Sequence, residues 1–332
     1  MAGYYYGQLS KEKKAVYDML AAGCDALAAV IRVPDLGTEV LSDIYLRMKL
    51  DLPLLFFVTG FHYRKMPGAD HVEVLPDYLF DRGKVKMHRQ AVTARLERLA
   101  RPLKGKSDRE KELAIHDFIL ENVTYDKLKK SYSHEIIGPL TQGVGVCEGI
   151  AKTVKVLCDA VGLPCIVALS EAAPEIGVRY RHTWNVVTVE GQRYHVDATF
   201  DNSLQRGMKR YDYFNLDDRH IFRDHQKLVL PLPECGGDKG YFYRSLSFTK
   251  TEDVEKRVRQ ALRKKPRAWR RPESGDPGAA AGEVRRCGGG AGQDRGLLPE
   301  PGAGGDPAGF LRRPGGRGAG GGAGRGTEAV NG

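Results

Sequence analysis

Apolar positions in the first third of the chain alternate between helical and strand spacing. Between Lys11 and Val30 they recur every three or four residues, which predicts an amphipathic helix. Two β-rich runs, Leu54 to Tyr63 and His71 to Leu79, flank a turn segment, and Lys84 to Leu99 returns to helical spacing. We expect these elements to form an N-terminal α/β region over residues 1–104.

A second domain is predicted over residues 105–264. Ser107 is followed three residues later by Glu110, a capping-box pattern that predicts a helix continuing to Asn122. A glycine-punctuated helix and several short β-rich runs come after it.

The composition changes sharply near Pro266. About half of the chain's glycines lie in its last fifth, with scarcely any apolar periodicity, so we expect residues 265–332 to be a disordered tail. The abrupt change is also typical of a frame-shifted end of a coding region. The Gly- and Arg-rich segment 315–326 resembles a tail that binds single-stranded nucleic acid, but such tails interleave stacking aromatics and only Phe310 lies near. No nucleic-acid partner is therefore expected.

Charge and cysteine usage fit an intracellular globular protein. The net charge is +10, yet the basic residues share their predicted helices with acids, which favours a solvated surface over a polyanion site. The six cysteines lack the paired short spacings of disulfide frameworks or zinc sites, so we expect reduced thiols, no metal and no cofactor. Without a leader segment or a long apolar run, the chain is predicted to be cytoplasmic and not in a membrane. No oligomeric state is predicted.

Cys147 is predicted to begin a helix. It follows the glycine-punctuated segment 143–146, and apolar residues after it recur at helical spacing as far as Val161. The exposed N–H groups and the positive end of the helix dipole favour a thiolate there, and the N–H of Cys147 itself could donate to an oxyanion. Taken alone, the cysteine fits a small core residue better than a nucleophile, because core packing is the usual role of free cysteines.

His182 and Asp197 lie on two β-rich runs separated by Glu190-Gly191, a hairpin signal. A two-residue loop places Asp197 diagonally across from His182 on one face of the sheet, within reach of its imidazole. A one-residue slip would turn Asp197 to the other face, so this geometry depends on the turn. His195, on the same face but in the middle of the sheet, is predicted to be structural. Cys147, His182 and Asp197 together meet the requirements for a nucleophile, a base and an orienting acid.

Three segments resemble the signature blocks of the transglutaminase-like superfamily: residues 145–151 around Cys147, residues 182–185 beginning at His182, and residues 194–201 around Asp197. The resemblance runs from about Glu112 to Asp224, and is strongest to bacterial transglutaminase-domain proteins and to the cytokinesis and kyphoscoliosis-peptidase group. It implies a papain-like α+β core, with the cysteine on a central helix that packs against an antiparallel sheet. Gln142 is similar in position to the oxyanion glutamine of papain-like enzymes, although its spacing is one residue short.

The residues and the resemblance together predict a cysteine-nucleophile enzyme that acts on peptide or carboxamide bonds through a thioester, with a protein or peptide substrate. Peptidase-type hydrolysis is the first choice, because the chain shows no added β-domains or calcium loops of the kind that larger animal transglutaminases carry. Protein-glutamine transamidation and a non-catalytic interaction module on the same fold are the alternatives. A metal protein that uses Cys147, His182 and Asp197 is disfavoured because no close-spaced ligand pair is present.

Overall fold

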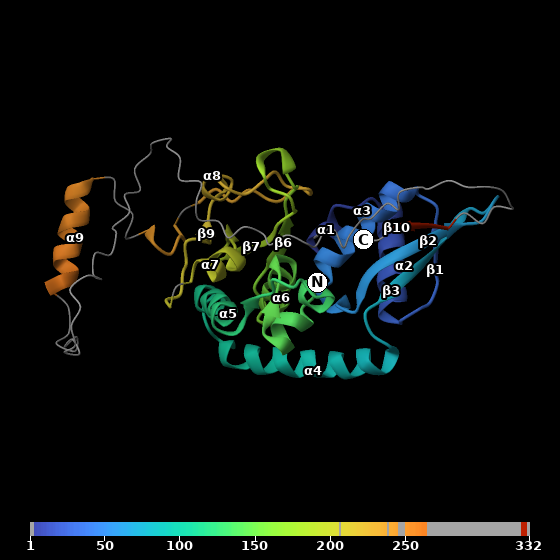
Figure 1. Ribbon diagram of the computed structural model, residues 1–332, viewed down its shortest axis with the longest axis horizontal. Helices are drawn as coiled ribbons and strands as arrows, with labels where there is room; N and C mark the ends of the chain where they lie inside the picture. Colours follow the sequence, from blue (N-terminus) through green and yellow to red (C-terminus); the bar gives the residue numbers. More distant parts are fainter. Residues whose placement is uncertain (1–2, 206, 238, 245–249, 264–326, 331–332) are drawn as a thin grey trace. The chain divides into compact units, whose positions relative to one another are not determined.

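A computed structural model of the chain describes residues 3–205, 207–237, 239–244, 250–263 and 327–330 (Figure 1). The described residues up to Tyr241 belong, with the strand β10 (Thr327–Val330), to one compact unit, and the helix α9 (Thr251–Arg263) belongs to a second. The predicted tail at residues 265–332 lies outside the described residues, apart from β10. None of the described helices has both the length and the apolar character needed to cross a membrane.

The N-terminal part of the first unit contains an antiparallel sheet with the strand order β1-β3-β2-β10. Its elements are α1 (Tyr4–Gly7), α2 (Lys11–Asp25), β1 (Ile31–Pro34), α3 (Thr38–Asp51), η1 (Pro53–Leu55), β2 (Val58–Lys65), β3 (His71–Tyr78) and α4 (Arg82–Ala100). A buried cluster of side chains from α2, α3 and the sheet fills its core. The pattern of apolar residues predicts α2, β2, β3 and α4 within a few residues of their observed ends.

Two details of this part differ from the sequence prediction. The helix predicted for Lys11 to Val30 ends at Asp25, because Leu27 adopts a left-handed conformation with φ of 56° and the chain then enters β1. The strand predicted from Leu54 begins only at Val58, because residues 53–55 form a short 3₁₀ helix that opens with a proline.

The second part of this unit contains another antiparallel sheet, with the strand order β6-β7-β8-β9. Its larger elements are α5 (Asp108–Asn122), α6 (Cys147–Ala160), β6 (Cys165–Leu169), β7 (Thr183–Val189), β8 (Gln192–Val196), α7 (Ala198–Leu204), β9 (Phe214–Leu216) and α8 (Asp218–Ile221). Short elements join α5 to α6: β4 (Thr124–Tyr125), η3 (Ser131–His134), η4 (Gly138–Gln142) and β5 (Val144–Gly145), of which β4 and β5 pair in parallel. A further 3₁₀ turn, η2 (Arg101–Leu103), follows α4, and η5 (Pro174–Ile176) precedes β7.

Helix α6 packs against this second sheet, as the predicted α+β core requires (Figure 1). Ile150, Val154 and Leu157 on α6 share a buried cluster with Val187 and Val196 of the sheet. Helix α5 begins with a complete capping box, as its sequence predicts. The apolar stripe of α6 therefore fixes the helix against the sheet, and this places the first residue of α6 beside the ends of β7 and β8.

Candidate functional site

Cys147 is the first residue of α6, the position that its sequence context predicts. Val146 before it is extended, and its N–H donates to the carbonyl of Ser133 at 3.0 Å. Gly149 allows the first turn to pack onto the same backbone, since a Cβ there would lie 2.2 Å from the Ser133 carbonyl oxygen. The N–H groups of a first helical turn have no intrahelical acceptor, so they are available to stabilise an anion at Cys147.

The hairpin between β7 and β8 has the predicted register. Glu190 and Gly191 form its two-residue turn with φ of 51° and 78°, and the paired residues run from Val189↔Gln192 to Asn185↔Val196. His182 immediately precedes β7, and Asp197 immediately follows β8. The two side chains meet at the open end of the hairpin, where the His182 Nε2 atom lies 2.6 Å from the Asp197 Oδ2 atom.

Asp197 has a second task that the sequence analysis does not predict. It is the N-cap residue of α7, and its Oδ1 atom accepts the N–H groups of Thr199 at 2.8 Å and Phe200 at 3.0 Å. The carboxylate is fully buried, so these bonds fix its plane and aim Oδ2 at His182. Helix α7 and the imidazole are therefore oriented by the same side chain.

The electrostatics of the site favour an ion pair between Cys147 and His182. Burial opposes charge on His182, but the charge and hydrogen bond of Asp197, together with a hydrogen bond to Cys147, raise its pKa to about 10. Burial likewise opposes a thiolate, yet the hydrogen bond and charge of His182 and the N–H of Thr183 lower the pKa of Cys147 below its ordinary value. Because Nε2 of His182 faces Asp197, Nδ1 is the nitrogen that can face the thiol.

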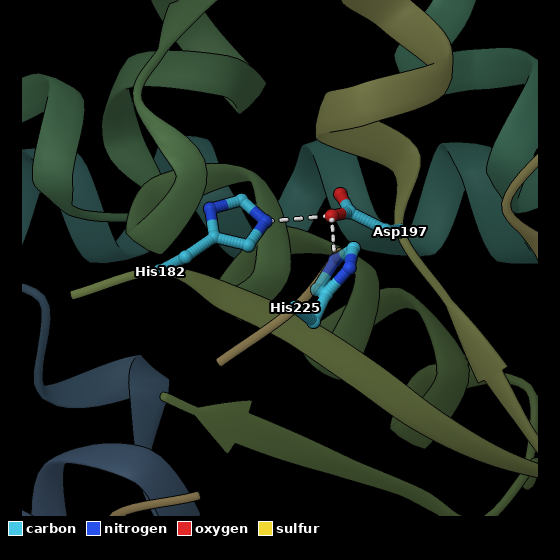
Figure 2. Close-up of side chains that lie close together, drawn as sticks. All are labelled: His182, Asp197 and His225. Carbon is cyan, nitrogen blue, oxygen red and sulfur yellow. Dashed lines mark hydrogen bonds and ion pairs between the residues drawn. The ribbon is translucent and has the colours of Figure 1, made fainter. Parts of the chain in front are cut away.

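His225 is a residue of the site that the sequence analysis misses. Figure 2 shows it beside Asp197, on the carboxylate oxygen that His182 also contacts: its Nε2 lies 2.9 Å from Asp197 Oδ2. Its Nδ1 lies 2.7 Å from Oδ1 of Asp224. His225 follows α8 in an irregular segment, so neither helical nor strand periodicity could have placed it, and the resemblance ends one residue before it.

His195, predicted to be structural, is buried and pairs with Val186 in the hairpin. Its Nδ1 accepts the indole N–H of Trp184 at 2.9 Å, so Nε2 carries the ring proton and donates to Asp218 at 2.8 Å. Trp184 in turn stacks on His182, with ring centroids 5.9 Å apart and an interplanar angle of 15°. His195 thus holds the indole of Trp184 in place, and Trp184 in turn supports the orientation of the His182 ring.

Among the residues that the structure describes, two groups of side chains bring possible metal-ligand atoms within 4.8 Å of one another: His182 with Asp197 and His225, and His195 with Asp218 and Cys235. A histidine nitrogen that donates a hydrogen bond has no lone pair left for a metal. The nitrogens facing carboxylates in both groups are such donors. We therefore assign neither group as a metal site.

Gln142, the predicted oxyanion donor, ends η4 and is exposed. Its Nε2 lies 3.4 Å from the hydroxyl of Thr141. The role of Gln142 stays a prediction. The backbone N–H of Cys147 belongs to the same residue as the thiol, so it lies close to the position where an oxyanion would form.

A buried ionic cluster holds the first turns of α6 against the N-terminal part of the chain. Lys152 Nζ lies 2.9 Å from a carboxylate oxygen of Glu135 and 2.6 Å from one of Glu148. Lys49, on α3, reaches the same Glu135 oxygen at 3.0 Å, and His134 lies 3.1 Å from Glu148. Lys152 is 0% exposed, so each charge in this cluster depends on its partners for stabilisation.

Replacing Lys152 by Met is expected to lower the free energy of unfolding by about 3 kcal/mol, because it leaves two buried carboxylates with one cation fewer. Urea denaturation followed by circular dichroism measures this loss. Lys155→Met is the matched control on the same helix: Lys155 pairs with Asp159, which is about half exposed, so its loss should cost about 1 kcal/mol or less. Equal free energies of unfolding for the two variants would contradict a stabilising role for the buried ion pairs of Lys152.

Comparison with known proteins agrees with the resemblance seen in the sequence. Residues 97–198 match the model of the transglutaminase-like superfamily core. Comparison with curated proteins gives no match.

Three solved structures are similar to parts of this chain. A TGase is 14% identical, with 55% of this chain and 52% of that chain covered and a TM-score of 0.30. A "putative cysteine protease" from Cytophaga hutchinsonii is 18% identical, with 42% and 60% covered and a TM-score of 0.27. A "putative protease" from Parabacteroides distasonis is 16% identical, with 43% and 37% covered and a TM-score of 0.26. The aligned part spans less than two thirds of each of these chains. The match to the family model covers the part of the chain that contains Cys147, His182 and Asp197.

Proposed function

We propose that this protein is a cysteine-nucleophile acyl-transfer enzyme that hydrolyses peptide or carboxamide bonds. One observation carries the proposal: a thiol at the start of a helix lies beside an imidazole whose far nitrogen is held by a buried carboxylate. These are the nucleophile, the base and the orienting group of covalent catalysis. A non-catalytic scaffold has no physical need for a thiol, an imidazole and a carboxylate placed next to one another in this order.

In the first half-reaction, the Cys147 thiolate attacks the substrate carbonyl carbon, and the carbonyl π electrons move to oxygen. The N–H of Cys147 is positioned to donate to this oxyanion. The oxyanion then collapses, the C–N bond breaks, and the departing amine takes the proton from Nδ1 of His182. The products are a thioester on Cys147, a free amine and a neutral His182.

In the second half-reaction, His182 removes a proton from water as the water oxygen attacks the thioester. Collapse of this intermediate releases a carboxylic acid and returns the thiolate and imidazolium. Solvent access favours water as the acceptor, because the His182 side chain is 19% exposed and Cys147 is not fully buried. Transamidation by a primary amine follows the same steps with an amine in place of water.

The reactivity of the thiol tests this proposal without a known substrate. We expect iodoacetamide to alkylate Cys147 well below the ordinary thiol pKa of about 8.5, since His182 stabilises the thiolate. Removing the imidazole in His182→Ala removes that stabilisation but keeps the burial, so the pKa should rise and labelling at pH 7 should slow by about tenfold or more. The rate is read by mass spectrometry of the peptide that contains Cys147, across pH 5 to 10.

His62→Ala is the control for this experiment, since His62 lies on β2 in the N-terminal sheet and pairs with Asp77. It should label like the wild type. A slow, ordinary labelling profile in the wild-type protein would instead indicate the non-catalytic interaction module.

A further inference from the structure

His225 lies between two carboxylates, and this fixes its charge. Its Nε2 is 2.9 Å from Asp197 and its Nδ1 is 2.7 Å from Asp224. A carboxylate accepts hydrogen bonds and donates none when ionised, so each ring nitrogen must supply a proton. Both nitrogens are then protonated, and His225 is an imidazolium whose side chain is only 1% exposed.

The ring of His225 is held in one place by its neighbours. Its centroid lies 4.8 Å from that of Trp184, 4.7 Å from Phe200 and 5.3 Å from His182. The titratable groups that face it are Asp197, Asp224, His182, Tyr213 and His195. The two carboxylates raise the pKa of His225 against the effect of its burial, while the nearby charge of His182 lowers it.

His225 and His182 share a single oxygen atom, Oδ2 of Asp197 (Figure 2). The other oxygen is occupied by two backbone N–H groups of α7. A carboxylate that serves four donors holds each of them less strongly than it would hold one alone. A fixed cation beside His182 also disfavours a second positive charge there.

We propose that His225 is a positioning residue of the site. It shares the Oδ2 atom of Asp197 with His182, and it thereby weakens the interaction by which Asp197 retains the proton on His182. The proposal rests on the proposed function, because the proton in question is the one that His182 delivers to the leaving amine. A proton held too firmly by the Asp197 pair would be delivered slowly. His225 thus tunes the general acid without touching the substrate.

The two amide substitutions at this position separate charge from hydrogen bonding. Gln places its amide nitrogen near the position of Nε2, so His225→Gln keeps a donor to Asp197 but removes the positive charge. Asn places its amide nitrogen near Nδ1, so His225→Asn keeps the bond to Asp224 and loses the one to Asp197. Both changes should raise the pKa of His182, by about one unit for Gln and by more for Asn, since only Asn frees Oδ2 for His182 alone.

The measurement is ¹⁵N NMR of histidine-labelled protein, in which the ring-nitrogen shifts report protonation directly. It is made on Cys147→Ala protein, so that His182 and His225 are read whether or not the thiol is a nucleophile. His62→Gln, a histidine beside a carboxylate in the N-terminal sheet, is the matched control and should leave both titrations unchanged. Asp224→Asn is a second way to remove the charge of His225, because it removes a partly exposed carboxylate that pairs with this histidine. It should lower the pKa of His225. At pH values where His225 has become neutral, the pKa of His182 should be raised.

A doubly protonated His225 at pH 7, with His182 shifted upward in the order wild type, Gln, Asn, supports the proposal. A singly protonated His225 in the unsubstituted site overturns it, and so does a His182 titration that none of the three substitutions moves. An ordinary iodoacetamide profile for Cys147 would reject the proposed enzyme instead, and it would leave these spectra readable.

Discussion

Replacing Cys147 by Ala is expected to reduce turnover of peptide or carboxamide substrates by about 10⁴-fold or more, because alanine has no thiol beside His182 to form the thioester. Wild-type and Cys147→Ala proteins would be incubated with peptide libraries, with and without a primary amine, and the products read by mass. Cleaved peptides from the wild type alone indicate hydrolysis. Incorporation of the amine into glutamine side chains indicates transamidation.

Cys158→Ala is the control for this substitution, since Cys158 lies on the same helix and is buried in the apolar cluster behind the site. It should keep its turnover and lose about 1 kcal/mol of stability. Equal product formation by the wild type and Cys147→Ala would contradict the nucleophilic role of Cys147.

Replacing Asp197 by Asn is expected to lower kcat by about 10³- to 10⁴-fold while the fold stays intact. The Asn carbonyl oxygen can still accept the N–H groups that cap α7. Its amide nitrogen, however, would face the N–H donors of His182 and His225, so His182 would lose both its fixed tautomer and the charge that stabilises its protonated form.

The pH dependence gives this prediction a direction. His182 has a pKa raised to about 10 mainly by Asp197, which acts against burial. Without that carboxylate the pKa falls, so the alkaline limb of kcat/KM should move to lower pH. Asp217→Asn is the matched control, because Asp217 caps α8 through its side chain. It should leave the pH profile unchanged, and an unshifted profile in Asp197→Asn would refute the role of the carboxylate.

The parts of the site that depend on local rules could be predicted from the sequence. Glycines before Cys147 mark the start of α6, and a two-residue turn at Glu190 and Gly191 sets the register that brings His182 and Asp197 together. Helix α3 could also have been predicted, since its buried residues Leu41, Ile44 and Met48 recur at helical spacing, but the sequence analysis does not predict it.

The remaining features depend on contacts between residues far apart in the chain. His225 reaches Asp197 across 28 positions from an irregular segment. Lys49 on α3 and Lys152 on α6 both reach Glu135, although 103 positions separate the two lysines in the sequence. No periodicity or turn rule encodes such pairings, and a charged residue in a sequence is ordinarily expected at the surface.

The pairing of Lys49 with Glu135 bears on how the protein can be divided. The predicted boundary falls between residues 104 and 105, but this ion pair and the hydrogen bond from Tyr5 to the carbonyl of Val167 on β6 both cross it. A fragment that starts at residue 105 would keep Glu135 and Lys152 but lose Lys49, and the carbonyl of Val167 on the edge strand β6 would lose its hydrogen bond from Tyr5. The first hundred residues therefore help to hold helix α6 in place, and transferring the candidate site to another protein would require transferring these residues with it.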